Sequence, residues 1–325
     1  MFGRRLRRPG GARIPVVALT GFLGAGKTTL LRALLATPEG ADSALVVNEY
    51  GEVGIDQALL RDSTDTIALL GNGCLCCRVR SDLQETLRTL LADRLLGRVP
   101  SFRRVIVETS GLADPGPLLQ TFLTDRAIGG EYHLRALVAV VDAATFADTA
   151  ARAPEARRQV ALADRVVLTK TDLADAAGAE AAVRALNPAA PMRAAVAGRI
   201  DPAFLLDEAP PRTDRGGTVP VAHSEGLETF SLVLDRPMRW EVFAQAMATL
   251  TALRGPDLLR VKGLVAVEGC AGPVVVHVVQ HLAHPPEELE RWPDDDRRTR
   301  LVFVTRAIPR ARVEAVFAAI EAAAG

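Results

Sequence analysis

One eight-residue segment constrains this chain more than any other. Gly21-Phe-Leu-Gly-Ala-Gly-Lys27-Thr28 matches the pattern G-x-x-x-x-G-K-[ST], and it follows the apolar run 14–19, which is typical of a buried strand. Residues 28–35 have the apolar spacing of a helix. A glycine-rich loop between a buried strand and a helix is the setting in which this motif binds phosphate. The sequence therefore predicts a nucleotide-binding fold.

The residue types in this loop have separate roles. Gly21, Gly24 and Gly26 let the backbone wrap closely enough for its N–H groups to face phosphate oxygens. Lys27 supplies a positive charge, and Thr28 supplies a hydroxyl ligand for Mg²⁺. Because positioning and charge stabilisation dominate phosphoryl transfer, Lys27 and Mg²⁺ on Thr28 are expected to provide most of the catalysis. No glutamine or arginine finger is evident, so we predict slow intrinsic turnover.

Composition narrows the class of protein. A length of 325 residues suggests about two domains. Lysine plus arginine equals aspartate plus glutamate, at 39 each, so net charge favours neither nucleic acid nor an anionic membrane as a partner. No apolar stretch is long enough to span a bilayer. Residues 1–12 are basic, and we expect them to be a flexible tail of a cytoplasmic protein.

Strand-like and helical patterns alternate through the first two hundred residues. Such alternation predicts an α/β fold of the P-loop NTPase class, with a mainly parallel sheet and helices on both faces. Ligands then belong at the carboxyl ends of the strands. The predicted strands are 44–48, 66–70, 104–108, 134–141 and 165–168, and the predicted helices are 81–96, 114–124, 155–163 and 173–186.

A second, smaller domain follows. Residues 208–217 are rich in proline, glycine and charge, which is typical of a linker between a P-loop domain at 13–207 and a C-terminal domain at 218–325. This last part is predicted to be α+β. Its predicted strands are 229–234, 259–267, 273–279 and 300–305, and its predicted helices are 240–253 and 310–324.

The segment Thr169-Lys170-Thr171-Asp172 points to guanine. It follows a predicted strand and matches the [NT]-K-x-D pattern. A carboxylate at Asp172 can accept hydrogen bonds from the N1–H and N2–H₂ groups of guanine, which adenine lacks, while the Lys170 stem packs on the ring. The alternative is that Asp172 only caps the following helix. We favour base recognition, and hence GTP.

A second acidic motif, Glu108-Thr-Ser-Gly111, ends another predicted strand. Glu108 is a candidate for the Mg²⁺ water shell, and Gly111 for an N–H that meets the γ-phosphate. The alternative is that Glu108 caps the helix that begins near residue 114. The glycine-punctuated, acidic stretch 48–56 suits a switch loop that orders around the γ-phosphate, with Asp56 as its metal-side ligand.

Three of the four cysteines lie within Gly73-Cys74-Leu-Cys76-Cys77. Thiolates are soft ligands that suit Zn²⁺, and this spacing is expected to present several sulfurs from one turn. Side chains so close in sequence rarely complete a tetrahedral site, so further ligands are needed. Packing and disulfide exchange are the alternatives.

Five motifs together resemble one known family, the CobW family of metal-binding P-loop GTPases, and most closely its YjiA-like branch. Leu258-Leu-Arg-Val-Lys-Gly and Val-Val-Gln280 resemble that family's second domain, so the resemblance covers nearly the whole chain. The five motifs are the phosphate loop, Asn48-Glu-Tyr-Gly-Glu-Val-Gly, Gly-Cys-Leu-Cys-Cys, Glu108-Thr-Ser-Gly-Leu-Ala-Asp-Pro-Gly-Pro and Thr-Lys-Thr-Asp.

The resemblance implies a cytoplasmic GTPase that binds zinc, or cobalt, nickel or iron in the divalent state, and delivers it to a client metalloprotein. It places Glu52 and Cys76 at positions used for metal in relatives, with Cys74 and Cys77 completing the family motif. Val47 stands where close relatives can carry a glutamate ligand. Phosphate and Mg²⁺ binding fall to Gly24, Ala25, Gly26, Lys27, Thr28 and Thr29, and guanine recognition to Asp172.

GTP binding is expected to order the switch loop and link Glu52 to the cysteines, so that the nucleotide state changes metal affinity. Two rival functions remain: a redox-sensing GTPase that uses Cys76 and Cys77, and a non-metal GTPase that activates a protein client. His277, His281 and His284 form a further possible ligand set, but the strand-like pattern around His277 favours a role in the sheet.

Overall fold

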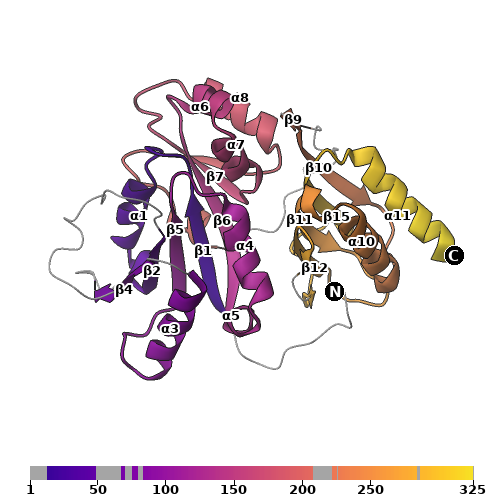
Figure 1. The fold of residues 1–325 in the computed structure, drawn as a ribbon, viewed down its shortest axis with the longest axis horizontal. Coiled ribbons are helices and arrows are strands. Elements are labelled where there is room, and N and C mark those ends of the chain that lie inside the picture. Colours follow the sequence, from indigo (N-terminus) through magenta and orange to yellow (C-terminus); the bar gives the residue numbers. More distant parts are fainter. Residues whose placement is uncertain are drawn as a thin grey trace. The chain divides into compact units, whose positions relative to one another are not determined.

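The computed structural model of the chain describes residues 13–48, 67–69, 75–79, 83–207, 222–224, 226–283 and 286–324. These residues form two compact units (Figure 1). The first contains residues 13–182 and 191–207, and the second contains residues 183–190, 222–224 and the described residues from 226 onward. The predicted tail at 1–12 and the predicted linker at 208–217 lie outside the described residues.

The first unit is built on an eight-stranded sheet of order β3-β4-β2-β5-β1-β6-β7-β8. All neighbouring pairs are parallel except β3 and β4, which are antiparallel. The prediction of a mainly parallel sheet is confirmed. The strands are β1 (Ile14–Thr20), β2 (Ser43–Asn48), β3 (Ile67–Leu69), β4 (Leu75–Val79), β5 (Arg104–Thr109), β6 (Tyr132–Asp142), β7 (Arg165–Thr169) and β8 (Met192–Ala195).

Helices cover this sheet on both faces (Figure 1). Val17 and Leu19 of β1 pack in one buried cluster with Leu30 of the first helix. Their neighbours Val16 and Ala18 point to the opposite face and are also fully buried, which is why the strands read as continuous apolar runs. The helices are α1 (Lys27–Leu35), α2 (Pro38–Ala41), α3 (Leu83–Leu95), α4 (Pro115–Thr124), α5 (Arg126–Glu131), α6 (Phe146–Arg152), α7 (Pro154–Ala161), α8 (Ala177–Leu186) and α9 (Pro202–Leu206).

Two predicted elements differ from the structure. The helix predicted at 173–186 begins only at Ala177, because residues 171–174 form a turn and a bend and the Asp175 carboxylate accepts the Ala177 N–H. The turn predicted at the cysteines is wrong for Leu75–Val79, which form strand β4 between β3 and β2. Backbone pairing with both neighbours fixes this segment as extended.

The second unit is an antiparallel sheet with two long helices, α10 (Trp240–Arg254) and α11 (Arg310–Ala324), and the short helix η1 (Gly255–Asp257). This confirms the predicted smaller α+β domain. The strand order is β13-β12-β11-β15-β10-β9, with β14 paired to β12. The strands are β9 (Ala222–Ser224), β10 (Leu227–Leu234), β11 (Leu258–Val265), β12 (Val274–Val279), β13 (Leu282–Ala283), β14 (Glu287–Glu288) and β15 (Thr299–Arg306).

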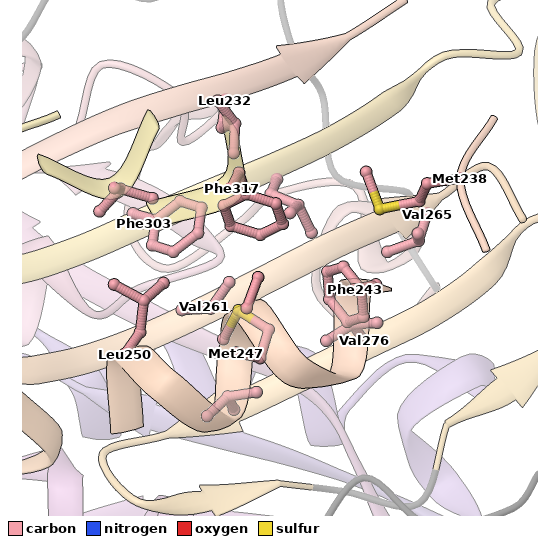
Figure 2. Packing of buried hydrophobic residues seen from close by; sticks show 14 of the residues in the cluster. Leu232, Met238, Phe243, Met247, Leu250, Val261, Val265, Val276, Phe303 and Phe317 are labelled. Carbon is pink, nitrogen blue, oxygen red and sulfur yellow. The ribbon is translucent and has the colours of Figure 1, made fainter. Parts of the chain in front are cut away.

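The core of the second unit lies between the sheet and these helices. Phe243 and Met247 of α10 belong to one buried apolar cluster with Phe303 of β15 (Figure 2). Phe230 stacks on Phe303 with 5.3 Å between ring centroids. Aromatic pairs at this separation add to the stability that area burial alone provides. Among the described helices, none combines the length and apolar character that crossing a bilayer requires.

The loop before β15 carries an ion-pair network that predicts acid sensitivity. Hydrogen bonds from the Arg298 guanidinium, at 2.9 and 3.0 Å, lower the pKa of Asp296 to about 2. A depressed pKa contributes stability that is present above the ordinary value of 3.8 and is lost as pH falls toward 2. Asp296→Asn is therefore expected to destabilise the chain at neutral pH, by an amount that shrinks between pH 4 and pH 2. Urea unfolding across this range measures it, with the exposed neighbour variant Asp295→Asn as control. A pH-independent loss would contradict the assignment.

Candidate nucleotide and metal site

The phosphate loop joins β1 to α1 and depends on glycine at three positions. Gly24 and Gly26 have φ angles of 74° and 90°, in the left-handed region that favours glycine. A Cβ at Gly21 would lie 2.3 Å from the carbonyl oxygen of Val140, so the loop starts in direct contact with β6. Gly26 is the residue immediately before α1, which places the loop at a helix N-terminus as the motif requires.

Lys27 lies inside this loop. Its side chain is buried, and Nζ donates to the carbonyl oxygens of Gly21 at 2.7 Å and Phe22 at 3.3 Å. Lysine occurs at only three positions of the chain, 27, 170 and 262, among 39 lysine and arginine residues. Two of the three lie in the predicted nucleotide motifs. A compact ammonium is thus used where a phosphate-binding loop needs a point charge.

The fold brings together the side chains of Thr28 and Glu108, which are 80 positions apart in the sequence. Thr28 Oγ1 donates to Glu108 Oε1 at 2.8 Å, and Glu108 is buried at the end of β5. A hydroxyl and a carboxylate are hard oxygen donors that fit Mg²⁺, so Thr28 and Glu108 would hold this ion, which would supply positive charge against the phosphates. The capping alternative for Glu108 is wrong, because Asp114 caps α4 by accepting the Gly116 N–H at 2.9 Å.

The predicted base-reading loop is tied to the phosphate loop. Thr169 Oγ1 donates to the carbonyl oxygen of Ala25 at 2.7 Å and lies 3.1 Å from that of Val141. Asp172 is exposed in the turn that follows. The capping alternative for Asp172 is wrong, since the carboxylate of Asp175 accepts the N–H of Ala177, the first residue of α8. The carboxylate of Asp172 therefore lies at the surface, in the turn that follows β7.

Asp142 lies beside the predicted base-reading segment, and the sequence did not single it out. It ends β6, and its Oδ2 atom lies 2.7 Å from Lys170 Nζ, while Oδ1 accepts the Ala144 N–H at 2.9 Å. Burial raises the pKa of Asp142, but these hydrogen bonds outweigh burial, and the net pKa lies below its ordinary value. Asp142 is thus ionised at neutral pH and orients Lys170. An acid at the end of an apolar strand, as at Glu108, was the available signal.

Two further loops meet the phosphate loop and α1. A Cβ at Gly111 would lie 2.8 Å from the Leu23 backbone nitrogen, so the glycine predicted to meet the γ-phosphate packs against the phosphate loop. After β8, Gly198 has a φ of 75°, and a Cβ there would lie 2.5 Å from the carbonyl oxygen of Thr29. The sequence did not predict this second loop, in which Gly198 follows the end of β8 by three residues.

The cysteine-bearing strand is two strands from Glu108. Cys76 and Cys77 of β4 pair in register with Leu45 and Val46 of β2, and the next β2 residue, Val47, pairs with Glu108 of β5. Neighbouring strands are ~4.8 Å apart, so β4 and β5 are separated by about 10 Å across the sheet. Val47 itself packs against the apolar cluster beneath α1.

Most of the predicted metal residues lie in segments that the structure does not describe. Glu52, Cys74, Asp56 and His284 lie outside the described residues, as do the side chains of Cys76 and Cys77. His277 is buried in β12, and His281 is exposed in the turn after it. Within the described part of the chain, no three histidine, cysteine, aspartate or glutamate side chains are grouped to hold a metal ion.

Comparisons with known proteins agree with this arrangement. Residues 15–194 match the family model of the CobW/HypB/UreG nucleotide-binding domain, and residues 227–321 match that of the cobalamin synthesis protein cobW C-terminal domain. The chain belongs to the CobW family. Both family models match this chain, and the resemblance seen in the sequence is confirmed.

CobW-family relatives cover nearly the whole chain. The zinc chaperone YjiA of Escherichia coli is 32% identical over 315 residues, which are 94% of this chain and 98% of that protein. The zinc chaperone CobW of Pseudomonas aeruginosa is 31% identical over 93% of this chain and 90% of that protein. The crystal structure of Zn(II)-bound YjiA GTPase from E. coli matches with a TM-score of 0.73 at 30% identity, over 95% of this chain and 99% of that one. This member of the CobW family therefore has the fold of a P-loop GTPase.

Proposed function

We propose that this chain binds GTP with Mg²⁺, hydrolyses it slowly, and binds zinc or a similar divalent transition metal that it delivers to a client metalloprotein. The nucleotide state is proposed to control metal affinity. We expect it to act in the cytoplasm, where thiols stay reduced. The observation that carries the proposal is the position of the cysteine-bearing strand β4 in the same sheet as Glu108 of β5, with only β2 between the two strands.

The nucleotide part of the proposal is supported by the contacts around Lys27. Lys27, Thr28 and Glu108 are proposed as the catalytic residues, because they form one connected set at the N-terminus of α1. Asp172 is proposed to read guanine, with Lys170 held by Asp142 to pack on the base. The phosphate-binding residues are proposed to be Gly21, Gly24, Ala25, Gly26, Thr29 and Gly111, with Asp56 on the metal side and Thr169 bracing the loop.

The metal part is supported by the relatives and by chemistry. Two relatives that span the chain are named zinc chaperones, and one is known as a Zn(II)-bound structure. We propose Glu52, Cys74, Cys76 and Cys77 as the ligand set. Thiolates and a carboxylate bind Zn²⁺, and the same ligands accept Co²⁺, Ni²⁺ or Fe²⁺. Val47, which packs as an apolar residue, contributes no ligand.

GTP hydrolysis with and without Zn²⁺ tests the coupling. Zn²⁺ is expected to accelerate hydrolysis about tenfold, the factor that ~1.4 kcal/mol of added transition-state stabilisation gives. Cys76→Ser is expected to abolish this acceleration and keep the metal-free rate, since a serine hydroxyl is a far poorer zinc ligand than a thiolate. Phosphate release measures both rates.

A matched control comes from the second unit. Cys270 is half-buried and packs against the apolar cluster there, so Cys270→Ser is expected to retain the response to Zn²⁺. Equal rates for wild type and Cys76→Ser under all conditions would remove the coupling. Metal analysis of the purified protein distinguishes the two rival functions. A redox-sensing GTPase would form a reversible disulfide and contain no stoichiometric metal, and a non-metal GTPase that activates a protein client would show neither a disulfide nor a bound metal.

A further inference from the structure

Gln159 of α7 is almost completely buried, at 1% exposure, and it holds the loop between β5 and α4. Its Nε2 atom donates to the carbonyl oxygens of Gly111 at 3.0 Å and Ala113 at 3.1 Å. The preceding residue, Arg158, pairs with Asp114 at 2.7 Å. Two consecutive side chains of one helix therefore hold Gly111, Ala113 and Asp114, which lie just after the Glu-Thr-Ser motif.

The same helix leads directly into the base-reading strand. After α7, Asp164 is anchored to β6 in both directions: its N–H donates to the Leu137 carbonyl at 2.7 Å, and its Oδ2 accepts the Leu137 N–H at 2.8 Å. Strand β7 starts at the next residue and ends at Thr169, which braces the phosphate loop. Gln159, which holds Gly111, therefore lies on a helix whose C-terminal end is fixed to β6 by the Asp164 hydrogen bonds.

The amide oxygen of Gln159, Oε1, is in an unusual environment. This atom is buried and makes no hydrogen bond with any described residue. A buried acceptor left without a donor costs free energy, so such atoms in native proteins call for an explanation. A rotation of the peptide unit between Gly111 and Leu112 would turn the Leu112 N–H toward Gln159 in place of the Gly111 carbonyl. Oε1 could then accept it.

Gly111 is suited to such a rotation. Without a Cβ it has the backbone freedom that the rotation needs, and a Cβ would lie 2.6 Å from Leu23 Cδ2. Leu112 is 55% exposed, so its side chain does not anchor the loop in the core. The restraint on this peptide unit comes from Gln159.

We propose that Gln159 is a positioning residue that holds Gly111 by its carbonyl, keeps the Gly111 N–H directed at the γ-phosphate, and thereby sets the preference for GTP over GDP. This inference rests on the proposed function, in which Gly111 meets the γ-phosphate. The same side-chain amide can hold the loop before and after this rotation. In the observed loop, Nε2 donates to the Gly111 carbonyl, and after the rotation Oε1 would accept the Leu112 N–H. GDP has no γ-phosphate, so its binding does not depend on the position of the Gly111 N–H.

The test compares the dissociation constants of fluorescent GDP and of a fluorescent, non-hydrolysable imido analogue of GTP, with Mg²⁺. Gln159→Leu fills the same space without hydrogen bonds, and it is expected to weaken analogue binding about tenfold while GDP binding stays near wild type. Gln159→Glu is expected to act in the same direction and to recover analogue affinity as pH falls, because protonation restores a donor. The matched control, Val160→Ala, removes buried volume from the next position of α7 and is expected to leave the ratio unchanged.

The outcomes distinguish a positioning role of Gln159 from a purely structural one. An equal change for both nucleotides in Gln159→Leu, or the same selective loss in Val160→Ala, would show a structural role only and overturn the inference while the proposed function stands. If Gln159→Leu does not fold, Arg158→Gln at a half-exposed position substitutes for it, with a smaller selective loss expected and no selective loss overturning the inference. A wild-type chain that binds neither nucleotide would remove the proposed function, and this inference with it.

Discussion

Replacing Asp172 with asparagine is expected to weaken GTP binding by about two orders of magnitude or more and to favour xanthosine triphosphate. The carboxylate is proposed to accept two hydrogen bonds from guanine, and each bond to a charged group contributes ~1.5–3 kcal/mol. An asparagine amide can instead donate to the extra carbonyl of xanthine. Because Asp172 is exposed in a turn, the substitution leaves the core intact. Competition of GTP, xanthosine triphosphate and ATP against a fluorescent nucleotide measures the change.

The control for this change lies three residues away. Asp175 caps α8 through its hydrogen bond to the Ala177 N–H, so Asp175→Asn is expected to keep the preference for GTP. Asparagine is as good a helix cap as aspartate, so little stability should be lost. If Asp172→Asn bound GTP as tightly as the wild type, Asp172 would not be the base reader.

Replacing Lys27 with methionine is expected to lower kcat/KM for GTP hydrolysis about a thousandfold. Methionine has a similar length but no charge, so the loop keeps its packing and loses the ammonium that Gly21 and Phe22 hold in place. Removing one preorganised electrostatic group from a phosphoryl-transfer site typically costs two to three orders of magnitude in rate. Phosphate release under single-turnover conditions separates this loss from weaker binding.

Lys262→Met is the matched control for Lys27→Met. It lies in β11 of the second unit, away from every nucleotide motif in the sequence, and Lys262→Met is expected to hydrolyse GTP at the wild-type rate. A Lys27→Met variant with the full rate would show that another group stabilises the transferred phosphoryl charge.

The sequence predicted those parts of the site whose signals are local. The phosphate loop, Glu108 and the Thr-Lys-Thr-Asp segment each combine a short motif with an apolar strand, and the structure places all three at strand ends around α1. Buried parallel strands read as apolar runs, so most of the sheet was also predictable.

The residues that were missed act over long separations in the chain. Gln159 reaches Gly111 across 48 positions, and Lys170 reaches Asp142 across 28, so neither contact leaves a pattern in a short window. Strand β4 was misread for a different reason. Its sequence Leu-Cys-Cys-Arg-Val is short and lacks alternation, and only pairing with β2 and β3 makes it a strand.

The linkage between nucleotide and metal is tested most directly by a zinc titration. We would measure the dissociation constant of Zn²⁺ with a competing chelator in the presence of GDP and of the imido analogue of GTP, both with Mg²⁺. Coupled sites typically change each other's affinity by about fivefold or more. We expect the zinc affinities in the two nucleotide states to differ by at least that factor, and we expect Cys76→Ser to abolish the difference. Equal zinc affinity in the two nucleotide states would contradict this expectation.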